Sequence, residues 1–314
     1  MTVAGTGRGV GTGRVVRTGK LNLFLEVLSR RPDGLHEIET VLVEGGGAEV
    51  LEARRTEDPG VTLEMTGLTP ATLDGVPRDG TNLAVRAARR VLEESGAGGG
   101  IALQLAKSLP AGSGMGGGSA DAAAALEAVD GLLGSPLGEA RLLELALELG
   151  SDVPFLLKGG AALARGRGER LEPVSTGPGL GFLVLHPGVP SSTAEVYGQC
   201  RPAEPGDRHE AGAVLEALTM GDPDALGEAC FNRLEDPART TCPAAALALD
   251  RLSDLGRRLG RGRAHLTGSG SSCFLLLPEA EVDRVETEGL TDGLPGGARI
   301  YRSSLLPDGA VHVR

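Results

Sequence analysis

The sequence has few aromatic residues. They make up 2% of the 314 residues, with no Trp, two Tyr and five Phe. Hydrophobic residues still amount to 40% and charged residues to 23%, as is usual for a soluble globular protein. We therefore expect cores built from Leu, Val, Ile and Ala. Any exposed aromatic side chain becomes a candidate for stacking on a ligand.

Long apolar runs and an excess of basic charge are also absent. No apolar run approaches the roughly 20 residues of a transmembrane helix. Residues 1–14 lack the apolar region of a signal peptide, and we expect them to form a disordered tail. The net charge of −11 argues against nucleic-acid binding, because backbone phosphates would be repelled. We expect neither a membrane nor a nucleic acid as a partner, and the sequence leaves the oligomeric state open.

The chain has four cysteines, at positions 200, 230, 242 and 273. Their spacing matches neither a zinc site nor a small disulfide scaffold. Buried thiols in a reducing cytoplasm are therefore expected.

Glycine is abundant, with 50 residues, and five of them lie between Gly112 and Gly118. An apolar segment, 101–106, precedes this stretch, and a run of alanines that favours a helix follows it. Without Cβ atoms the loop can turn several N–H groups toward one point, and the start of the helix adds its free N–H groups and positive dipole end. This pattern predicts a phosphate-binding loop.

Other interpretations of the loop differ in what must follow it. A Walker-type P-loop requires Lys and Ser or Thr where this chain has Gly118 and Ser119. A dinucleotide motif, G-x-G-x-x-G, matches at Gly112, Gly114 and Gly117, but no second strand ending in an acidic residue follows its helix. A flexible glycine-rich linker would not require an apolar strand and an alanine-rich helix on its two sides.

The remaining pattern predicts a mixture of strands and helices in two domains. A proline-containing segment, 172–181, is the best candidate for the boundary. We expect the domains to span residues 15–172 and 173–314. Expected strands are 15–28, 38–43, 48–53, 61–65, 101–106, 161–164, 182–186, 264–267 and 273–277. Expected helices, besides the one after the glycine loop, are 83–92, 139–149, 211–219 and 243–259.

Two charged residues stand out as candidates for phosphoryl-transfer chemistry. Asp152 follows the end of a predicted helix, and we expect Pro154 to keep Val153 out of the helical conformation and hold Asp152 in a turn. Lys20 lies on an apolar strand and shares a face with Asn22. A lysine near an aspartate keeps the carboxylate ionised, so the pair could accept a hydroxyl proton. Taken singly, each fits a snorkelling lysine or an ordinary helix-end aspartate equally well.

Together with these residues, six segments resemble the GHMP kinases in order and spacing. They are G-K-L-N-L-F-L (19–25), R-P-D-G-L-H-E (31–37), the loop 110–121, G-S-D-V-P-F (150–155), A-R-G-R-G-E (164–169) and T-G-S-G-S-S-C-F (267–274). The resemblance implies a two-domain α+β fold, with an N-terminal domain like ribosomal protein S5 domain 2 and a ferredoxin-like C-terminal domain. It implies a kinase that uses ATP and Mg²⁺, with Ser119 as the one candidate protein ligand for the metal.

The resemblance also implies roles for individual residues. Lys20 and Asp152 would be the catalytic pair, and Asn82 and Lys107 would line the adenine side of the nucleotide pocket. The ATP phosphates would bind the loop residues Pro110, Gly112, Gly114, Met115, Gly116, Gly117, Gly118 and Ser119.

Within the GHMP kinases, the matching segments imply a cytidine diphosphate-linked methylerythritol as the substrate. Asn22 would hold the acceptor, His36 would hydrogen-bond the cytosine, and Tyr197 would stack on it. Gly268 and Ser269 would close over the site from the second domain. Leu35 replaces the usual second aromatic, and Thr18-Gly19 replaces the usual Pro-Ala, so homoserine or a mevalonate derivative is an alternative acceptor. A catalytically idle nucleotide-binding regulator is a further alternative, against which the retained Lys20 and Asp152 argue.

Overall fold

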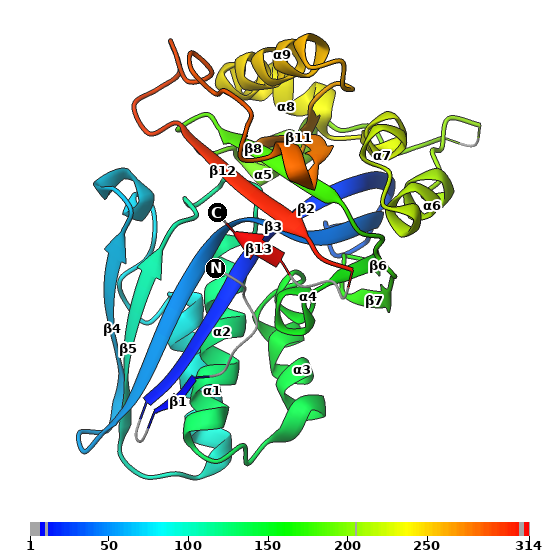
Figure 1. Cartoon of the computed structure of the whole chain (residues 1–314). Coiled ribbons are helices and arrows are strands. Elements are labelled where there is room, and N and C mark those ends of the chain that lie inside the picture. The colour runs from blue at the N-terminus through cyan, green and yellow to red at the C-terminus, as the bar shows by residue number, and fades with distance from the viewer. Residues whose placement is uncertain (1–6, 10–11, 205, 308–310, 314) are drawn as a thin grey trace.

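The computed structural model describes residues 7–9, 12–204, 206–307 and 311–313, and it contains two β-sheets with helices outside them (Figure 1). The larger sheet has eight strands: β1 (Gly7–Gly9), β2 (Thr12–Arg30), β3 (His36–Thr56), β4 (Gly60–Gly67), β5 (Gly100–Lys107), β6 (Ala161–Gly166), β7 (Arg170–Pro173) and β9 (Phe231–Asn232). The smaller sheet has five: β8 (Leu180–His186), β10 (His265–Leu266), β11 (Cys273–Pro278), β12 (Arg299–Leu305) and β13 (Val311–Val313).

The larger sheet is organised on the long antiparallel pair β2 and β3. Its path runs β1-β2-β3-β5-β4, with β6 and β7 continuing from the other part of β3 and β9 pairing with β2. The two strands predicted at 38–43 and 48–53 are one strand, because pairing with β2 continues on both sides of a register shift at the glycines, where Gly46 has a φ of 86°. An added Cβ at Gly45 would lie 2.9 Å from Leu21 Cδ1, so glycine allows the close approach of β2.

Nine α-helices occur in the described residues. They are α1 (Leu83–Ser95), α2 (Gly117–Leu132), α3 (Gly138–Leu149), α4 (Val153–Lys158), α5 (Thr193–Gln199), α6 (Gly212–Met220), α7 (Pro223–Ala229), α8 (Glu235–Thr241) and α9 (Pro243–Arg258). Short 3₁₀ helices span Pro70–Leu73 and Glu279–Glu281. The helices predicted at 83–92, 139–149, 211–219 and 243–259 are confirmed.

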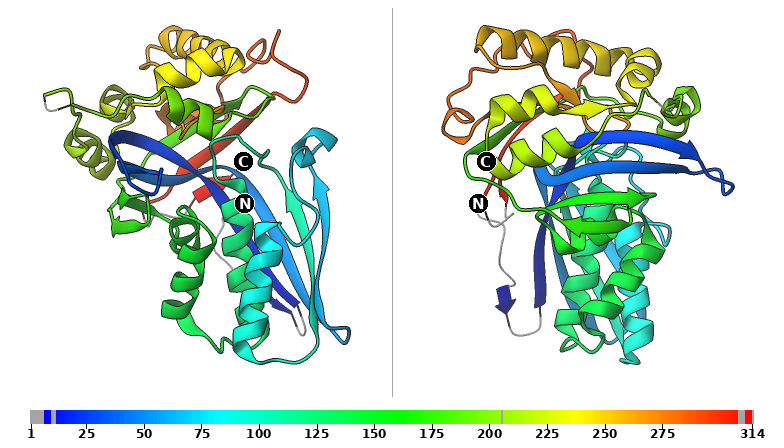
Figure 2. Two further views of the ribbon diagram at one scale, coloured as in Figure 1. Left: turned by 180° about the vertical axis from the view of Figure 1, so that it is seen from behind. Right: turned by 90° about the vertical axis from the view of Figure 1, so that its right-hand side faces the viewer.

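Helices α1, α2 and α3 cover one face of the larger sheet (Figure 2). The alanines of α2 are buried there, and their small side chains let this helix pack closely on β2 and β3. The two sheets share a second core, which includes Phe24 of β2 with Phe182 and Phe274 of the smaller sheet. A third core lies under α8 and α9. The few aromatic residues thus gather where the sheets meet, and aliphatic side chains fill most of the remainder.

Two local predictions were wrong. The tail expected at residues 1–14 contains β1 and the start of β2 where it is described, with Thr12 opposite Arg54 on β3. The remaining residues of that tail lie outside the described part. Pro154 does not keep Val153 out of a helix, because α4 begins at Val153 and a proline in the first turn lacks an N–H that would have no partner there.

The predicted boundary segment, 172–181, connects β7 of the larger sheet to β8 of the smaller one.

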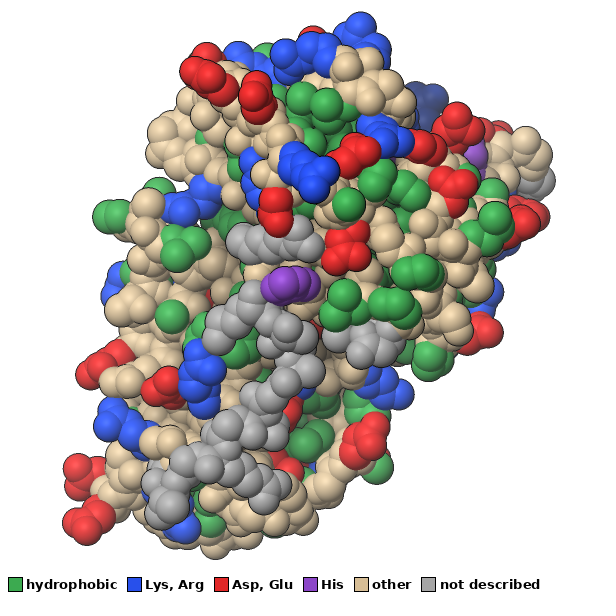
Figure 3. Space-filling model, viewed as in Figure 1, with side chains coloured by type: hydrophobic (Ala, Val, Ile, Leu, Met, Phe, Trp, Pro, Cys, Tyr) green, Lys and Arg blue, Asp and Glu red, His purple; other side chains and the backbone are tan. Residues whose placement is uncertain are grey.

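On the face shown in Figure 3, acidic and basic side chains are interspersed. No helix among the described residues has both the length and the apolar character needed to cross a bilayer.

Candidate active site

The glycine loop connects β5 to α2 and begins the candidate site. Gly112, Gly114 and Gly116 have φ values of 65°, 80° and 73°, which favour glycine. A Cβ on Gly114 would lie 2.4 Å from the carbonyl oxygen of Thr267, so a loop from the C-terminal part of the chain packs directly on it. At Gly118 the nearest atom to an added Cβ is a Leu83 methyl at 3.6 Å. The first turn of α2 is therefore open.

A cavity of about 320 Å³ lies in front of this loop. It is lined by side chains or backbone from β2, β3, the start of α1, the glycine loop, the residue before α4, the turn between β6 and β7, α5 and the loop after β10. The predicted site residues on its wall are Lys20, Asn22, Pro110, Gly112, Gly114, Gly116, Gly117, Gly118, Ser119, Asp152, Tyr197, Gly268 and Ser269. Residues far apart in the sequence thus meet around one space.

Lys20 and Asp152 flank the glycine loop. An added Cβ on Gly116 would be 3.3 Å from Lys20 Cγ and 3.7 Å from Asp152 Oδ2. The Lys20 ammonium is buried and donates a hydrogen bond to Asn22 Oδ1 at 2.6 Å. Burial lowers the pKa of Lys20, and the negative charge of Asp152 opposes that shift. A carboxylate, an ammonium and a set of loop amides therefore face one point, as phosphoryl transfer requires.

The C-terminal part of the chain completes the wall next to Asn22. The Asn22 backbone N–H donates to Thr267 Oγ1 at 3.2 Å, and its side-chain amide donates to Thr40 Oγ1 at 2.9 Å. Asn232 donates to the Gly268 carbonyl at 2.8 Å and fixes the loop that carries Gly268. The expected closure by residues 268 and 269 is therefore a packed contact in this structure.

The far end of the cavity carries the aromatic side chains. The rings of His36 and Tyr197 lie 4.8 Å apart between centroids and are inclined by 30°. Burial and the nearby Arg30 lower the pKa of His36, which favours the neutral imidazole, able both to donate and to accept a hydrogen bond. Leu35 is 46% exposed beside this pair. We call this region the aromatic end, and the region of the glycine loop the phosphate end.

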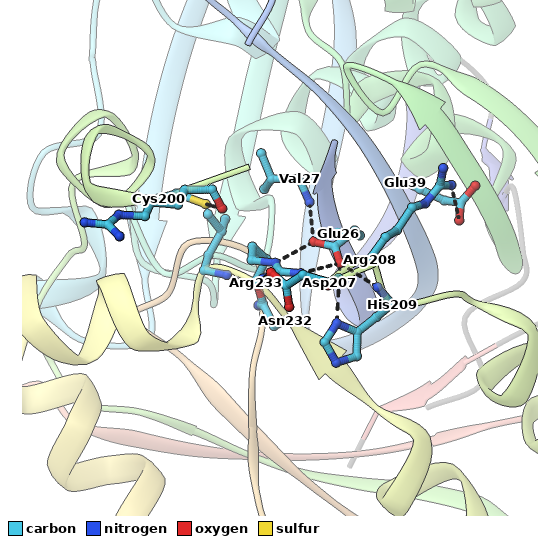
Figure 4. A network of polar contacts seen from close by, with 11 residues as sticks. Glu26, Val27, Glu39, Cys200, Asp207, Arg208, His209, Asn232 and Arg233 are labelled. Atoms are coloured by element: carbon cyan, nitrogen blue, oxygen red, sulfur yellow. Dashed lines mark hydrogen bonds and ion pairs between the residues drawn. The ribbon is translucent and has the colours of Figure 1, made fainter. Parts of the chain in front are cut away.

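A buried carboxylate of β2 joins this strand to the segment that follows α5 (Figure 4). Glu26 of β2 is fully buried and accepts two hydrogen bonds from Arg233, at 2.7 and 2.8 Å. It also accepts the backbone N–H of His209 at 2.9 Å, in the segment that follows α5. Burial alone would raise the pKa of Glu26, but these donors and the Arg233 charge lower it. The segment after Tyr197 is therefore tied to β2.

Four predicted residues do not lie on the cavity wall. Asn82 caps α1 by accepting the Ala84 N–H at 2.9 Å, and Met115 is buried with its carbonyl accepting the Lys20 N–H at 2.9 Å. Lys107 is buried in ion pairs. His36 contacts the ring of Tyr197 but does not itself line the cavity. Direct contacts of these four with ligands stay predictions.

Sequence reasoning missed several residues of the wall, and two of them with polar side chains are Arg167 and Thr193. In the sequence, Arg165, Arg167 and Arg170 form a basic cluster with glycines, which is typical of a solvated turn. Arg165 pairs with Glu39 at 2.9 Å and Arg170 with Glu37 at 2.7 Å, whereas Arg167 lines the cavity. Among the described residues no carboxylate lies within ion-pair distance of Arg167.

Thr193, at the start of α5, is the second missed residue. Its hydroxyl lies 2.9 Å from that of Ser269, and both line the cavity. The serine and threonine residues before Tyr197 were the available signal, since they are typical of a helix start near a ligand.

A larger hollow of about 680 Å³ lies along the first part of β2 and the ends of α2 and α3. It has no glycine loop, and its Arg17 is paired with Glu127 across it. We place the site at the smaller cavity, because only there do a phosphate-binding loop and a charged pair converge.

Comparisons with known proteins agree with this geometry. The chain matches the GHMP kinases N terminal domain over residues 82–160 and the GHMP kinases C terminal domain over residues 214–289. It is 37% identical to 4-diphosphocytidyl-2-C-methyl-D-erythritol kinase of Rhodopirellula baltica, covering 94% of this chain and 96% of that protein. It is 41% identical to the kinase of that name from Kineococcus radiotolerans, over 82% of this chain and 79% of the other.

Comparison with solved structures leads to the same family. A crystal structure of 4-(cytidine 5'-diphospho)-2C-methyl-D-erythritol kinase matches with a TM-score of 0.71 and 34% identity, covering 91% of this chain and 97% of that one. Homoserine kinase from Cytophaga hutchinsonii has a TM-score of 0.72 at 20% identity, with 98% and 99% covered, which shows a shared fold. With two GHMP kinase domains in an α+β fold and these relatives along most of its length, the chain belongs to the GHMP kinases, in the family of the 4-diphosphocytidyl-2-C-methyl-D-erythritol kinases.

Proposed function

We propose that the protein transfers the γ-phosphoryl group of ATP to the 2-hydroxyl of 4-diphosphocytidyl-2-C-methyl-D-erythritol, a step toward isoprenoid precursors. The observation that carries this proposal is the convergence of Lys20, Asp152 and the glycine loop on one cavity. The names of the relatives supply the acceptor. Homoserine or a mevalonate derivative is the alternative acceptor, because such kinases share the fold.

The phosphate end fits a nucleotide triphosphate. Three glycines with positive φ turn the loop, and Gly118 and Ser119 leave the first turn of α2 open toward the cavity. ATP with Mg²⁺ supplies the phosphoryl group and screens its charge. We propose that the amides of 114–119 hold the β- and γ-phosphates and that Ser119 is the candidate metal ligand.

The chain's own part in the reaction is to orient a hydroxyl and receive its proton. Asp152, at the start of α4, is the proposed acceptor of the proton. The Lys20 ammonium, which interacts electrostatically with Asp152, directs the hydroxyl, and Asn22 fixes that ammonium. We further propose that Arg167 binds the diphosphate of the acceptor, since Arg167 lines the cavity while Arg165 and Arg170 are paired with glutamates.

The experiment is to measure ADP release with the cytidyl substrate, homoserine and mevalonate side by side. We expect turnover with the first alone. Asp152→Asn should lose at least ~10²-fold in kcat, the lower end of general-base contributions, while the KM for ATP stays nearly unchanged. Lys20→Ala should act in the same direction, and the double variant should cost less than the product of the two losses.

Each outcome of this experiment has a clear consequence. Turnover of homoserine or mevalonate instead would overturn the acceptor, and no turnover with bound ATP would favour a regulator. Wild-type kcat in Asp152→Asn would exclude a protein base.

We also propose a reducing cytoplasm as the location of the enzyme. All four cysteines are free thiols, and three of them are buried.

A further inference from the structure

Three charged side chains form a buried cluster beneath the glycine loop. Lys107, the last residue of β5, donates to Glu49 of β3 at 3.1 Å and to Asp121 of α2 at 2.6 Å. The side chains of Glu49, Lys107 and Asp121 are 0%, 2% and 3% exposed. None of them reaches the cavity wall. We call this group the Glu49 cluster.

The cluster holds both limbs of the glycine loop. On the entering limb, the backbone N–H groups of Ser108 and Leu109 donate to the two Glu49 oxygens, each at 3.0 Å. On the leaving limb, Asp121 lies about one turn into α2, and an added Cβ on Gly117 would be 3.0 Å from Leu109 Cβ and 3.4 Å from Glu49 Oε1. One lysine thus joins the two limbs to β3.

The charges of the cluster are not balanced, because one ammonium serves two carboxylates. Burial and the charge of Asp121 raise the pKa of Glu49 to about 8, against the effect of Lys107. Asp121 Oδ1 is buried and has no hydrogen-bond partner among the described residues. The other titratable group nearby is Tyr301 of β12, whose hydroxyl donates to the Ser108 carbonyl at 2.8 Å and whose pKa is raised, chiefly by burial.

We propose that Glu49 is a positioning residue for the nucleotide, which acts by fixing the two limbs of the glycine loop through Ser108, Leu109, Lys107 and Asp121. This inference rests on the proposed binding of ATP at that loop. Backbone amides bind phosphate well only when they already point at it, so a loop with loosened limbs binds more weakly. Lys107 then serves the nucleotide through the loop and not by direct contact.

The test measures binding of the non-hydrolysable analogue adenylyl imidodiphosphate with Mg²⁺, together with kcat and both KM values. At a pH above 8, where Glu49 is ionised, Glu49→Gln should raise the Kd of the analogue and the KM for ATP roughly tenfold, the size of one lost charge-assisted hydrogen bond. The KM for the acceptor should change less than about twofold, because Asn22 and Tyr197 lie on other elements.

Glu44→Gln is the matched control. Glu44 is a buried carboxylate on the same strand, and it accepts the Gly160 N–H at 2.8 Å and the Thr18 hydroxyl at 2.9 Å without touching the glycine loop. Its loss should leave the Kd of the analogue unchanged. Equal Kd values in wild type and Glu49→Gln would overturn the inference, and so would equal weakening in the two variants.

A second variant, Asp121→Asn, tests the proposal if Glu49→Gln does not fold. Asp121→Asn retains an oxygen for Lys107 but removes the charge that helps to raise the pKa of Glu49. The pH dependence of analogue binding should therefore move to lower pH, and a profile that coincides with wild type would overturn the inference. If wild type itself does not bind the analogue, the proposed function fails instead.

Discussion

Two fully buried glutamates, on β2 and β3, differ in the donors that surround them. Glu49 accepts two backbone N–H groups and shares Lys107 with Asp121, whereas Glu26 accepts two backbone N–H groups and two hydrogen bonds from Arg233, which also donates to Asp207. Burial raises the pKa of Glu49 to about 8, and the donors to Glu26 outweigh burial and lower its pKa. The second carboxylate differs between the two sites, because Asp121 beside Glu49 is buried, whereas Asp207, which shares Arg233 with Glu26, has a side chain that is 61% exposed.

The largest effect should follow from removing the cation that pairs with Glu26. Arg233→Met leaves Glu26 buried without its ion-pair partner, and we expect a loss of about 3 kcal/mol in the free energy of unfolding. The control is Arg239→Met, which breaks an ion pair with Asp250. The side chains of Arg239 and Asp250 are 35% and 59% exposed, so this variant should lose less than about 1 kcal/mol in the free energy of unfolding. Urea unfolding measures both. Similar losses would show that Arg233 does not balance Glu26.

The pH dependence of stability should separate the two glutamates. The raised pKa of Glu49 means that the folded chain keeps a proton which the unfolded chain loses near pH 4.5, so stability should fall as the pH rises from about 5 to 8. Glu49→Gln should remove this slope. Glu26 has a lowered pKa, so its contribution should be lost only as the pH falls below about 4.5.

Thermal unfolding of wild type, Glu49→Gln and Glu26→Gln across pH 3 to 9 checks this prediction. The expected result is a flattened curve above pH 5 in Glu49→Gln and below pH 4.5 in Glu26→Gln. The opposite assignment, or no change in either curve, would refute the comparison of the two carboxylates.

The parts of the site that could be predicted from sequence are those with local signals, and the parts that could not depend on strand register. Lys20, Asp152 and the glycine loop could be predicted because their signals are local and match a motif, and the structure brings them to one cavity. The partner of Lys107 could not be predicted, since Glu49 lies 58 residues away and meets it only through the pairing of β3 with β5. Arg167 was missed for a related reason, because Glu39 opposes Arg165 only in the register of β3 with β6. The register between strands that are distant in the sequence cannot be derived from local hydrophobic periodicity.

The phosphate end should be sensitive to a single methyl group. Gly118→Ala fits the folded chain, where the added Cβ meets only a Leu83 methyl at 3.6 Å, and alanine favours a helix over glycine. We expect stability to be kept while the Kd for nucleotide rises roughly tenfold, because the methyl occupies space the phosphate needs. Gly131→Ala, later in α2 with nothing within 4 Å, is the control. Equal nucleotide binding in both variants would place the phosphates elsewhere.

The smallest effect is expected at the aromatic end, where side chains and not backbone form the site. Leu35 is 46% exposed and precedes His36, whose ring lies 4.8 Å from that of Tyr197. Stacking of a base on an aromatic side chain contributes about 1–3 kcal/mol, and an exposed position should give the lower value. Leu35→Tyr should therefore lower the KM for the cytidyl substrate about fivefold and leave the KM for ATP unchanged.

Leu247→Tyr, which adds the same ring to the surface of α9, should change neither value. An unchanged KM in Leu35→Tyr would mean that the base does not reach this side of the His36 and Tyr197 pair, and that Tyr197 alone provides the stacking surface.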